Sequence, residues 1–459
     1  MSALITLSVL AIFVLYLGLF KAKNALLPVT LVGLATVIGL SVMEWNNNPE
    51  PIYSGMMLFD NFAIAFTVIC VFSTMLILLI SRDYFERISE HVAEYYTIIM
   101  FSLVGIMVMV SYHNLSMLFI GIEIMSVSLY ILAGIRRKSF SSNEAALKYF
   151  LMGAFSTGFL LFGIALLYGA TGSFDLTVIK SYVIDNPTNI SPLFYSGLLL
   201  LIIGLCFKVG VAPFHFWAPD VYEGSPSLIS VFMMTVVKTA GFAAFLRIFL
   251  VCFAPLHEFW MMPLLIITVI TLFIGNVSAL YQHSFKRMLA FSSVSHAGYM
   301  LFAIIALGND SINAVILYAT AYSVASIIAF AVLILVKRQM GSDSYESFNG
   351  LGRKNPFMAF TLTIAMLSLG GIPLTAGFIG KFMMFSAVLS EYHVVLVVLA
   401  VINALIGIFY YLRVVVAMYF KDPDHHTVLS SPIFSFVLAF SAIVTIVLGV
   451  YPGLISNLF

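Results

Sequence analysis

The feature that most constrains this chain is a series of long apolar runs separated by short polar segments. Each run has about 20 residues, and a helix of that length crosses the roughly 30 Å of hydrocarbon in a bilayer. We therefore predict an all-α, polytopic membrane protein with about 14 transmembrane helices. The predicted spans are residues 2–20, 25–44, 59–81, 95–112, 114–135, 145–169, 192–213, 226–251, 259–281, 287–307, 311–336, 356–388, 394–419 and 430–456.

The composition agrees with a membrane protein. Hydrophobic residues make up 62% of the chain and charged residues 9%, whereas soluble domains have about 25% charged residues. A net charge of +1 gives no indication of a nucleic-acid partner, so the lipid bilayer is the expected environment. Cys70, Cys206 and Cys252 lie singly in apolar runs, without the paired spacing of an iron–sulfur or zinc site. With no Walker-type loop and no dinucleotide fingerprint either, we expect no cofactor or metal in this chain.

Basic residues predict the orientation of the chain, because Lys and Arg concentrate in cytoplasmic loops. Every second predicted loop holds them, whereas Lys180 is alone in the longest of the alternate loops. The loop after the seventh span is the one predicted cytoplasmic loop without a base, and it carries Asp220 and Glu223 instead. This alternation fits 14 spans with both termini on the outer side. The bases concerned are Lys21 and Lys23; Arg82 and Arg87; Arg136, Arg137 and Lys138; Lys286 and Arg287; Lys337, Arg338, Arg353 and Lys354; and Lys421.

Five ionisable residues lie deep in predicted spans, one in each of spans five, seven, eight, ten and twelve. They are Glu123, Lys208, Lys238, His296 and Lys381. A lysine at the centre of a membrane helix costs roughly 2.5–3.5 kcal/mol on insertion scales, so such residues are kept for a function. We predict that the five form a lateral row that carries protons. Moving Glu123 toward or away from Lys208 would switch that lysine between holding and releasing a proton.

Structural alternatives exist for each of these residues. A single membrane histidine such as His296 is more often a packing residue that forms hydrogen bonds. Lys148, near a span end, is expected to reach the interface or to pair with Glu144 one turn earlier. The deep lysines with Glu123 would, in this alternative, be ion pairs that fix helix packing. Because a buried ion pair adds little stability, we favour the functional interpretation.

Two predicted spans contain interruptions beside a lysine. In the seventh, Gly204, Gly210 and Pro213 surround Lys208, and in the twelfth the segment SLGGIPLTAGFIGKF precedes and includes Lys381. Broken helices at membrane depth are tolerated only where they face protein or a water-filled cavity. Paired interruptions in two halves of a chain indicate inverted repeats around a transport site. The alternative is a proline kink used for packing.

Three motifs give the chain a family resemblance. They are FKVGVAPFHFWAPDVYEGSP followed by Lys238, then FKRMLAFSSVSHAGYM, then LGGIPLTAGFIGKF. These motifs resemble the antiporter-like membrane subunits of respiratory complex I, an NADH:quinone oxidoreductase. The similarity covers about residues 95–420, and the forms VYEGSP and EAALKYF are closest to the N-type members of that family.

The resemblance implies a specific organisation. Three N-terminal spans (1–94) precede two inverted five-helix repeats (95–251 and 259–420), and a C-terminal span (421–459) follows. Helices seven and twelve are expected to be broken. Glu123 and Lys208 match the family's glutamate–lysine pair, Lys238 and His296 its central connecting residues, and Lys381 its terminal lysine. Lys148 and His215 also fall in family motifs and are secondary candidates.

The resemblance also implies an activity and a location. The assembled enzyme of such a family oxidises NADH with FMN and iron–sulfur clusters in other subunits, reduces quinone and pumps protons outward. This chain would be a proton-translocating subunit in a cell (inner) membrane, with its termini on the periplasmic side. Its partners would be other antiporter-like subunits and small hydrophobic subunits. The alternatives are a subunit of a multi-subunit sodium/proton antiporter and a structural spacer.

Overall fold

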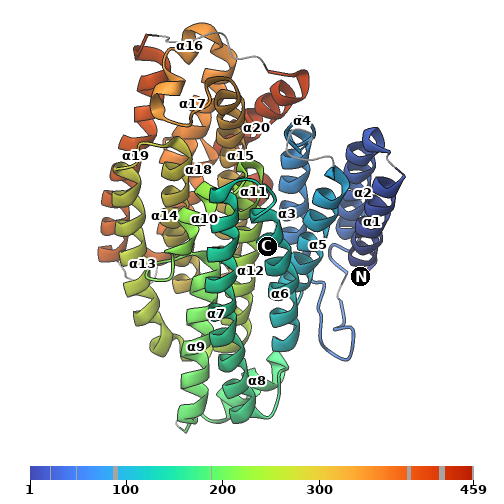
Figure 1. The fold of residues 1–459 in the computed structure, drawn as a ribbon. Coiled ribbons are helices and arrows are strands. Elements are labelled where there is room, and N and C mark those ends of the chain that lie inside the picture. Colours follow the sequence, from blue (N-terminus) through green and yellow to red (C-terminus); the bar gives the residue numbers. More distant parts are fainter. Residues whose placement is uncertain are drawn as a thin grey trace. The chain divides into compact units, whose positions relative to one another are not determined.

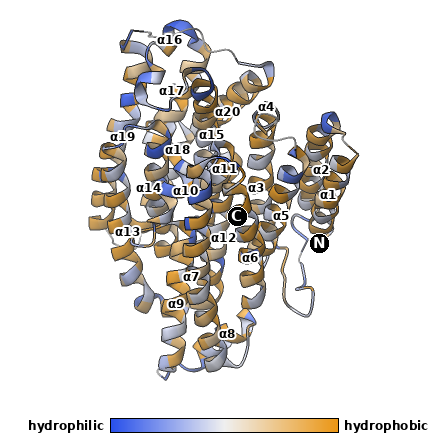
Figure 2. Cartoon of the chain, in the orientation of Figure 1, coloured by the Kyte–Doolittle hydropathy of each residue, from blue (hydrophilic) through white to orange (hydrophobic). Residues whose placement is uncertain are grey.

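The structure is a computed structural model, and it confirms the all-helical fold (Figure 1). It describes residues 1–456 except 21, 48, 86–90, 188, 390–393 and 423–429, and these described residues contain no β-strand. Two of the basic residues used to predict orientation, Lys21 and Arg87, lie outside them. Apolar residues cover most of the helical ribbon, as the sequence predicts (Figure 2).

Twelve described helical stretches are long and apolar enough to cross a membrane, and two further apolar helices are shorter. The predicted spans 226–251 and 259–281 fall in one of these stretches, Ser227–Leu280. No loop divides this stretch, because π-helical and 3₁₀ turns at Phe249–Phe253 and Ala254–Leu256 carry the chain on into the next α-helix. The predicted span 356–388 is divided between the two shorter helices. The count of 14 spans and the inverted repeat therefore stay predictions.

The chain forms two compact units, and residues 1–78, 82–210 and 236–263 make up unit 1. Its helices are α1 (Ser2–Leu19), α2 (Lys23–Met43), α3 (Asn61–Leu79, its last residue in unit 2), α4 (Arg82–Phe85), α5 (Val92–Val110), α6 (Leu115–Ala133), α7 (Phe140–Thr171), α8 (Leu176–Asp185), α9 (Pro192–Val209) and α12 (Lys238–Ile248). Helix α1 packs on α5, so the predicted N-terminal three spans (1–94) contact the helix that follows them. The predicted division of the single membrane domain at residue 94 stays a prediction.

Glycine allows two helix pairs of unit 1 to approach closely. A Cβ atom at Gly105 of α5 would lie 2.5 Å from the backbone nitrogen of Met125 in α6. A Cβ atom at Gly163 of α7 would lie 2.8 Å from the carbonyl oxygen of Gly197 in α9. Small residues of this kind let membrane helices pack backbone against backbone. They position α6, α7 and α9, the three helices that carry Glu123, Lys148 and Lys208.

Residues 79–81, 211–235 and 264–459 make up unit 2. Its helices are α10 (Trp217–Gly224), α11 (Ser227–Phe232), α13 (His257–Leu280, beginning in unit 1), α14 (Phe285–Ala306), α15 (Asn309–Met340), α16 (Leu351–Lys354), α17 (Pro356–Gly370), α18 (Ala376–Leu389), α19 (Val394–Phe420), α20 (Pro432–Val450) and α21 (Gly453–Ser456). A π-helical turn, Met233–Val237, joins α11 to α12, and a 3₁₀ turn, Tyr345–Phe348, follows α15.

The core of unit 2 is built around α15. Helices α14, α17, α18 and α20 all pack on it, and its apolar stretch is completely buried. A helix that is apolar on all sides is expected to lie inside a protein or a membrane, and α15 lies inside the protein. This arrangement brings α14 and α18, which carry His296 and Lys381, against the same central helix.

The chain leaves helical geometry at both places where the sequence predicts an interruption. Helix α9 ends at Gly210, which has a left-handed φ of 73°, and α17 ends at Gly371, with φ of 81°. Glycine adopts this conformation without the steric penalty that a Cβ atom imposes, and it commonly ends helices for that reason. In unit 2, α18 begins at Ala376 after a short loop.

Candidate ion-translocation site

Glu123 and Lys208 lie near one another in unit 1. The Nζ atom of Lys208 donates a hydrogen bond to the hydroxyl of Ser126 (2.7 Å), one turn after Glu123 on α6. The carboxylate of Glu123 accepts a hydrogen bond from Thr157 of α7 (2.8 Å), and its charge acts on Lys208. Both charged side chains are half-buried. The predicted pairing is therefore a polar cluster in which Ser126 is the direct partner of the lysine.

Lys208 lies in the last turn of α9, just before the capping glycine. The C-terminal end of a helix carries partial negative charge, because its last carbonyl groups have no intrahelical donors. Gly210 donates its backbone N–H to the carbonyls of Cys206 and Phe207. The helix end and the Glu123 carboxylate thus both stabilise the ammonium form of Lys208.

Lys238 is buried within unit 1, where only 2% of the residue is exposed. It begins α12 directly after the π-helical turn, and α12 packs against α5 and α9. Single π-helical turns inside helices occur frequently at functional sites, because they redirect the side chains that follow. Since α9 carries Lys208, helix packing brings the two lysine-bearing helices of unit 1 together.

His296 lies at the centre of unit 2 on α14 and is 2% exposed. Its Nδ1 atom is 2.6 Å from the hydroxyl of Tyr318 on α15, and its Nε2 atom is 3.0 Å from the hydroxyl of Tyr411 on α19. The ring of Tyr322 packs against the imidazole with a centroid separation of 4.7 Å. The packing alternative for His296 predicted hydrogen bonds, and these bonds are present on both ring nitrogens.

Lys381 binds the broken end of α17. Its Nζ atom donates hydrogen bonds to the carbonyl oxygens of Leu369 (2.9 Å) and Gly370 (3.0 Å). The same atom lies 4.9 Å from the centre of the Tyr299 ring, in cation–π geometry. Lys381 is 6% exposed. Its partners among the described residues are therefore backbone carbonyls and an aromatic ring.

The structure thus distributes the five predicted residues between its two units. Glu123, Lys208 and Lys238 belong to unit 1, whereas His296 and Lys381 belong to unit 2. In unit 2 a shared neighbour connects the pair, because Tyr299, one turn after His296 on α14, contacts both the imidazole (6.1 Å between centroids) and the Lys381 ammonium. The continuous row across all five remains a prediction.

The two secondary candidates have different surroundings. Lys148 forms the predicted ion pair with Glu144 (2.8 Å), and both side chains are more than two-fifths exposed. His215 is buried in the segment that follows the end of α9, packed on Phe216. Within the described part of the chain its Nδ1 atom has no hydrogen-bond partner.

The sequence analysis did not predict the neutral side chains that contact the charged residues of the site. These are Ser126, Thr157, Tyr299, Tyr318 and Tyr411. A polar residue inside a predicted span could have indicated a partner for a charged group. However, hydroxyl-bearing residues are common in these spans, and most of their hydroxyls bond to the backbone of their own helix. No spacing along the chain distinguishes these five residues from the other hydroxyl-bearing ones.

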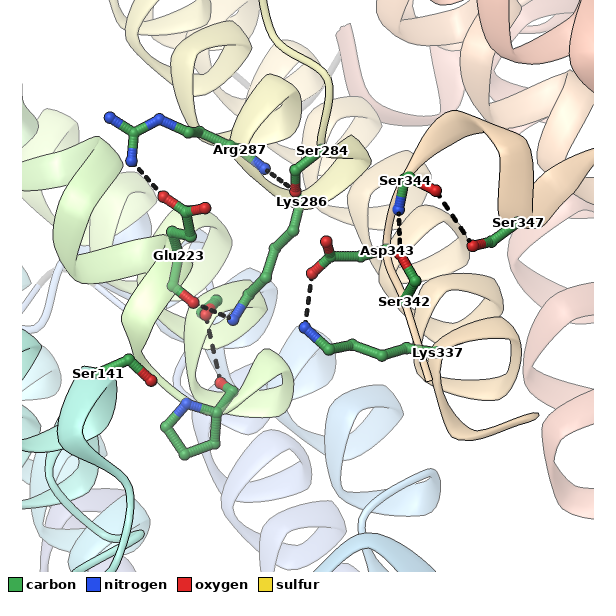
Figure 3. A network of polar contacts seen from close by, with 12 residues as sticks. Ser141, Glu223, Ser284, Lys286, Arg287, Lys337, Ser342, Asp343, Ser344 and Ser347 are labelled. Atoms are coloured by element: carbon green, nitrogen blue, oxygen red, sulfur yellow. Dashed lines mark hydrogen bonds and ion pairs between the residues drawn. The ribbon is translucent and has the colours of Figure 1, made fainter. Parts of the chain in front are cut away.

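A separate group of ion pairs lies where α14 begins (Figure 3). Arg287 pairs with Glu223 and with Asp220 (3.3 Å to Oδ1). The Nζ atom of Lys286 donates hydrogen bonds to the backbone carbonyls of Glu223 (2.8 Å) and Ser225, at the end of α10. These contacts explain the acidic loop after the seventh predicted span, because its two acids pair with Arg287 at the start of α14.

A neighbouring ion pair secures the loop after α15 (Figure 3). Lys337 pairs with Asp343 (2.5 Å), whose carbonyl oxygen accepts the backbone N–H of Phe285 (2.8 Å). Burial alone would raise the pKa of Asp343, but the hydrogen bond and charge of Lys337 hold it below its ordinary value. Asp343 therefore stays ionised, which anchors this loop to the start of α14.

The described residues include no group of three or more His, Cys, Asp or Glu side chains that could hold a metal ion. The three cysteines are buried and free. The chemistry that the described side chains offer is proton binding and release by lysine, histidine, glutamate and tyrosine.

The fold and these buried groups define an ion-translocating type of helical membrane protein. A profile of the family described as "NADH:quinone oxidoreductase/Mrp antiporter, TM" matches residues 111–407. A relative from Cytophaga hutchinsonii, named NADH-quinone oxidoreductase subunit N, is 38% identical over all of this chain and 99% of its own length. The chain therefore belongs to the NADH:quinone oxidoreductase/Mrp antiporter family and, within it, to the subunit N group.

Solved structures agree with this assignment. A chain of respiratory complex I from Thermus thermophilus is 32% identical, with a TM-score of 0.85, and the match covers 99% of this chain and 98% of that one. A chain of the Mrp complex from Dietzia is 17% identical, with a TM-score of 0.87, covering 100% of this chain and 95% of that one. At that identity the second match shows a shared fold alone, so the relatives favour complex I over the antiporter alternative.

Proposed function

We propose that this chain is the proton-translocating subunit N of an NADH-quinone oxidoreductase. In this proposal other subunits, which hold FMN and iron–sulfur clusters, transfer electrons from NADH to quinone. This chain contributes no redox centre and moves protons outward across the cell membrane. Its partners are the antiporter-like and small hydrophobic membrane subunits of the same enzyme. The support is the similarity to subunit N relatives over the whole chain.

One observation supports the proposal: two lysines in predicted membrane spans, Lys208 half-buried and Lys381 buried, have neutral direct partners. Lys208 binds a serine hydroxyl, and Lys381 binds two backbone carbonyls. Neutral oxygens stabilise an ammonium group less than a paired carboxylate does, so the proton can leave without separating an ion pair. A lysine placed only for stability would be better paired, because an unpaired buried charge is costly.

Glu123 supplies the switch in this mechanism. Its carboxylate favours the charged form of Lys208, whereas burial favours the neutral form. A conformational change that moves α6 relative to α9 would alter the distance between the two groups and thereby release or recapture the proton. Thr157 holds the carboxylate by a hydrogen bond, so α7 participates in setting that distance.

The proposal extends to the arrangement of the whole path. Its members are Glu123, Lys208, Lys238, His296 and Lys381, with Lys148 and His215 in secondary roles. Residues 95–251 and 259–420 are the two inverted repeats, between the segments 1–94 and 421–459. Both termini lie on the periplasmic side of the inner membrane. The support is the alternation of basic loops and the family membership.

The test is a Lys208→Arg substitution in the assembled enzyme. Arginine keeps the positive charge but does not deprotonate in proteins. We expect NADH-driven proton uptake by inside-out membrane vesicles to fall at least tenfold per assembled enzyme, because one proton carrier is lost. Proton uptake is measured with a pH-sensitive dye, and enzyme content by immunoblot of the membrane.

The matched control is Lys337→Arg, which makes the same change in a partly exposed ion pair in the last turn of α15 and should leave proton uptake unchanged. Wild-type proton uptake by the Lys208→Arg enzyme would support the structural-spacer alternative. Proton uptake that is independent of NADH but driven by a sodium gradient would instead support the sodium/proton antiporter.

A further inference from the structure

One tyrosine hydroxyl lies within hydrogen-bond distance of each ring nitrogen of His296. Tyr318 approaches Nδ1 from α15 (2.6 Å), and Tyr411 approaches Nε2 from α19 (3.0 Å). The three residues lie in unit 2 and are at most 2% exposed. Three separate helices thus converge on one ring, with a hydroxyl on each of its two nitrogens.

This geometry suits a ring that changes its protonation state. A neutral imidazole has one N–H donor and one acceptor nitrogen, whereas the protonated ring has two donors. A tyrosine hydroxyl both donates and accepts, so the pair Tyr318 and Tyr411 can complement both neutral tautomers and the imidazolium. A backbone carbonyl on either side could complement only an N–H.

Four further titratable groups lie near this ring. Tyr322 stacks on the imidazole and Tyr299 meets its edge, with centroid separations of 4.7 and 6.1 Å. Lys381 lies beyond Tyr299, and Tyr410 lies beyond Tyr411, 4.5 Å between ring centroids. The hydroxyl of Tyr322 is buried and has no hydrogen-bond partner among the described residues.

We propose that Tyr318 and Tyr411 are proton-transferring residues of the path, which hold His296 between two hydroxyls so that a proton enters at one ring nitrogen and leaves from the other. This inference rests on the proposed function. In one passage the Tyr318 O–H bond breaks as an Nδ1–H bond forms, and the phenol oxygen regains a proton from a hydronium ion, which becomes water. The Nε2–H proton passes to the Tyr411 oxygen, whose own hydrogen goes to a water molecule, which becomes a hydronium ion.

That passage leaves the imidazole in the opposite tautomer. Before the next proton, the two hydroxyls must exchange their donor and acceptor roles by rotation, and the ring must return to its first tautomer. Both tyrosines exchange protons with His296 directly, so their removal should also alter how strongly the ring holds its proton. A phenylalanine at either position removes one acceptor that the imidazolium uses, while it keeps the ring volume.

The experiment compares Tyr318→Phe and Tyr411→Phe with Tyr322→Phe in the assembled enzyme. Tyr318 and Tyr322 lie one turn apart on α15, and both are buried against His296, so they make a matched pair. We expect NADH-driven proton uptake to fall at least fivefold for the first two variants and less than twofold for Tyr322→Phe. The acidic limb of the pH–rate profile should move to lower pH for the first two variants alone, because hydrogen bonds to the charged form of a group favour that form.

A second measurement tests that the hydroxyl acts through the ring. In a His296→Gln background, Tyr318→Phe should cause less than a twofold further loss of proton uptake per assembled enzyme, since the coupled partner is already absent. If either Tyr318→Phe or Tyr411→Phe fails to assemble, the other variant still tests the inference. Equal proton uptake and equal pH profiles for all three variants would overturn the inference. This result differs from failure of the proposed function, in which Lys208→Arg retains proton uptake.

Discussion

The ammonium groups of Lys381 and Lys286 each contact carbonyl oxygens where another helix ends. Lys381 binds the last residues of α17, and Lys286 binds the end of α10. Carbonyl groups at a helix end have no donor from their own helix, and hydrocarbon offers none. A lysine in these positions therefore satisfies backbone groups while the helix end compensates part of the cost of burying its charge.

A third buried cation, Arg247, depends on one carboxylate. Arg247 in α12 is 4% exposed and pairs with Asp60 (2.5 Å), before α3, while its guanidinium lies over the Phe62 ring. We predict that Asp60→Asn lowers the stability of the chain by about 2–3 kcal/mol, because it leaves the arginine without a counter-charge. This range is below that of fully buried pairs because Asp60 is 32% exposed. Heating of membranes, followed by immunoblot of the subunit that remains assembled, measures the change.

The control removes both charges. In the double variant Asp60→Asn/Arg247→Met, part of the lost stability should return, because no charge remains buried without a partner. If membranes with the Asp60→Asn variant retain the subunit at the same temperatures as wild-type membranes, the ion pair contributes nothing to the stability of the chain.

For the helices, the sequence predicted where most of them lie, because helix positions depend on residues that are close together in the chain. Apolar runs of about 20 residues specify membrane helices, and Gly210 and Gly371 end α9 and α17 as expected. The partners of His296 could not be predicted, because Tyr318 and Tyr411 are 22 and 115 residues away along the chain. Only the packing of α14 against other helices brings them together.

The contact between α7 and α9 provides a prediction at this scale. Gly163→Ala places a methyl group within 2.8 Å of backbone atoms of Gly197 and Leu201. We expect it to force the helices apart, at a cost of about 1–3 kcal/mol. Because α9 carries Lys208, proton uptake should fall as well. Thermal retention of the assembled subunit and NADH-driven proton uptake are the measurements.

The same helix provides the control, since a Cβ atom at Gly158 of α7 meets nothing within 4 Å. Gly158→Ala should be neutral or slightly stabilising, because alanine favours a helix by up to about 1 kcal/mol over glycine. Equal stability of the two variants would contradict close backbone packing at Gly163.

For the whole molecule, the orientation in the membrane can be measured by labelling introduced cysteines, because the three native cysteines are buried. Cys70, Cys206 and Cys252 are buried, so the unmodified protein should react little with a membrane-impermeant thiol reagent. Lys138 and Lys180 are exposed, and they lie in the segments on either side of α7. A helix of 32 residues is about 48 Å long, which is enough to separate these segments by a bilayer.

We predict that the reagent labels the Lys180→Cys variant in right-side-out spheroplasts and the Lys138→Cys variant in inside-out vesicles. This pattern follows from the concentration of basic residues on the cytoplasmic side. The reverse pattern would invert the orientation, and labelling of both variants from one side would mean that α7 does not cross the membrane.

The completely buried apolar stretch of α15 affects how the protein is made. Synthesis proceeds from the N-terminus, so α15 enters the bilayer before α17, α18 and α20, which later surround it, have been translated. It must therefore first tolerate lipid tails on the sides that those helices will cover. Its polar side chains suit this stage, as Thr320 shows by donating its hydroxyl hydrogen to the carbonyl of Ile316 in the same helix (2.8 Å). The order of translation thus limits which residues the centre of the finished protein can contain.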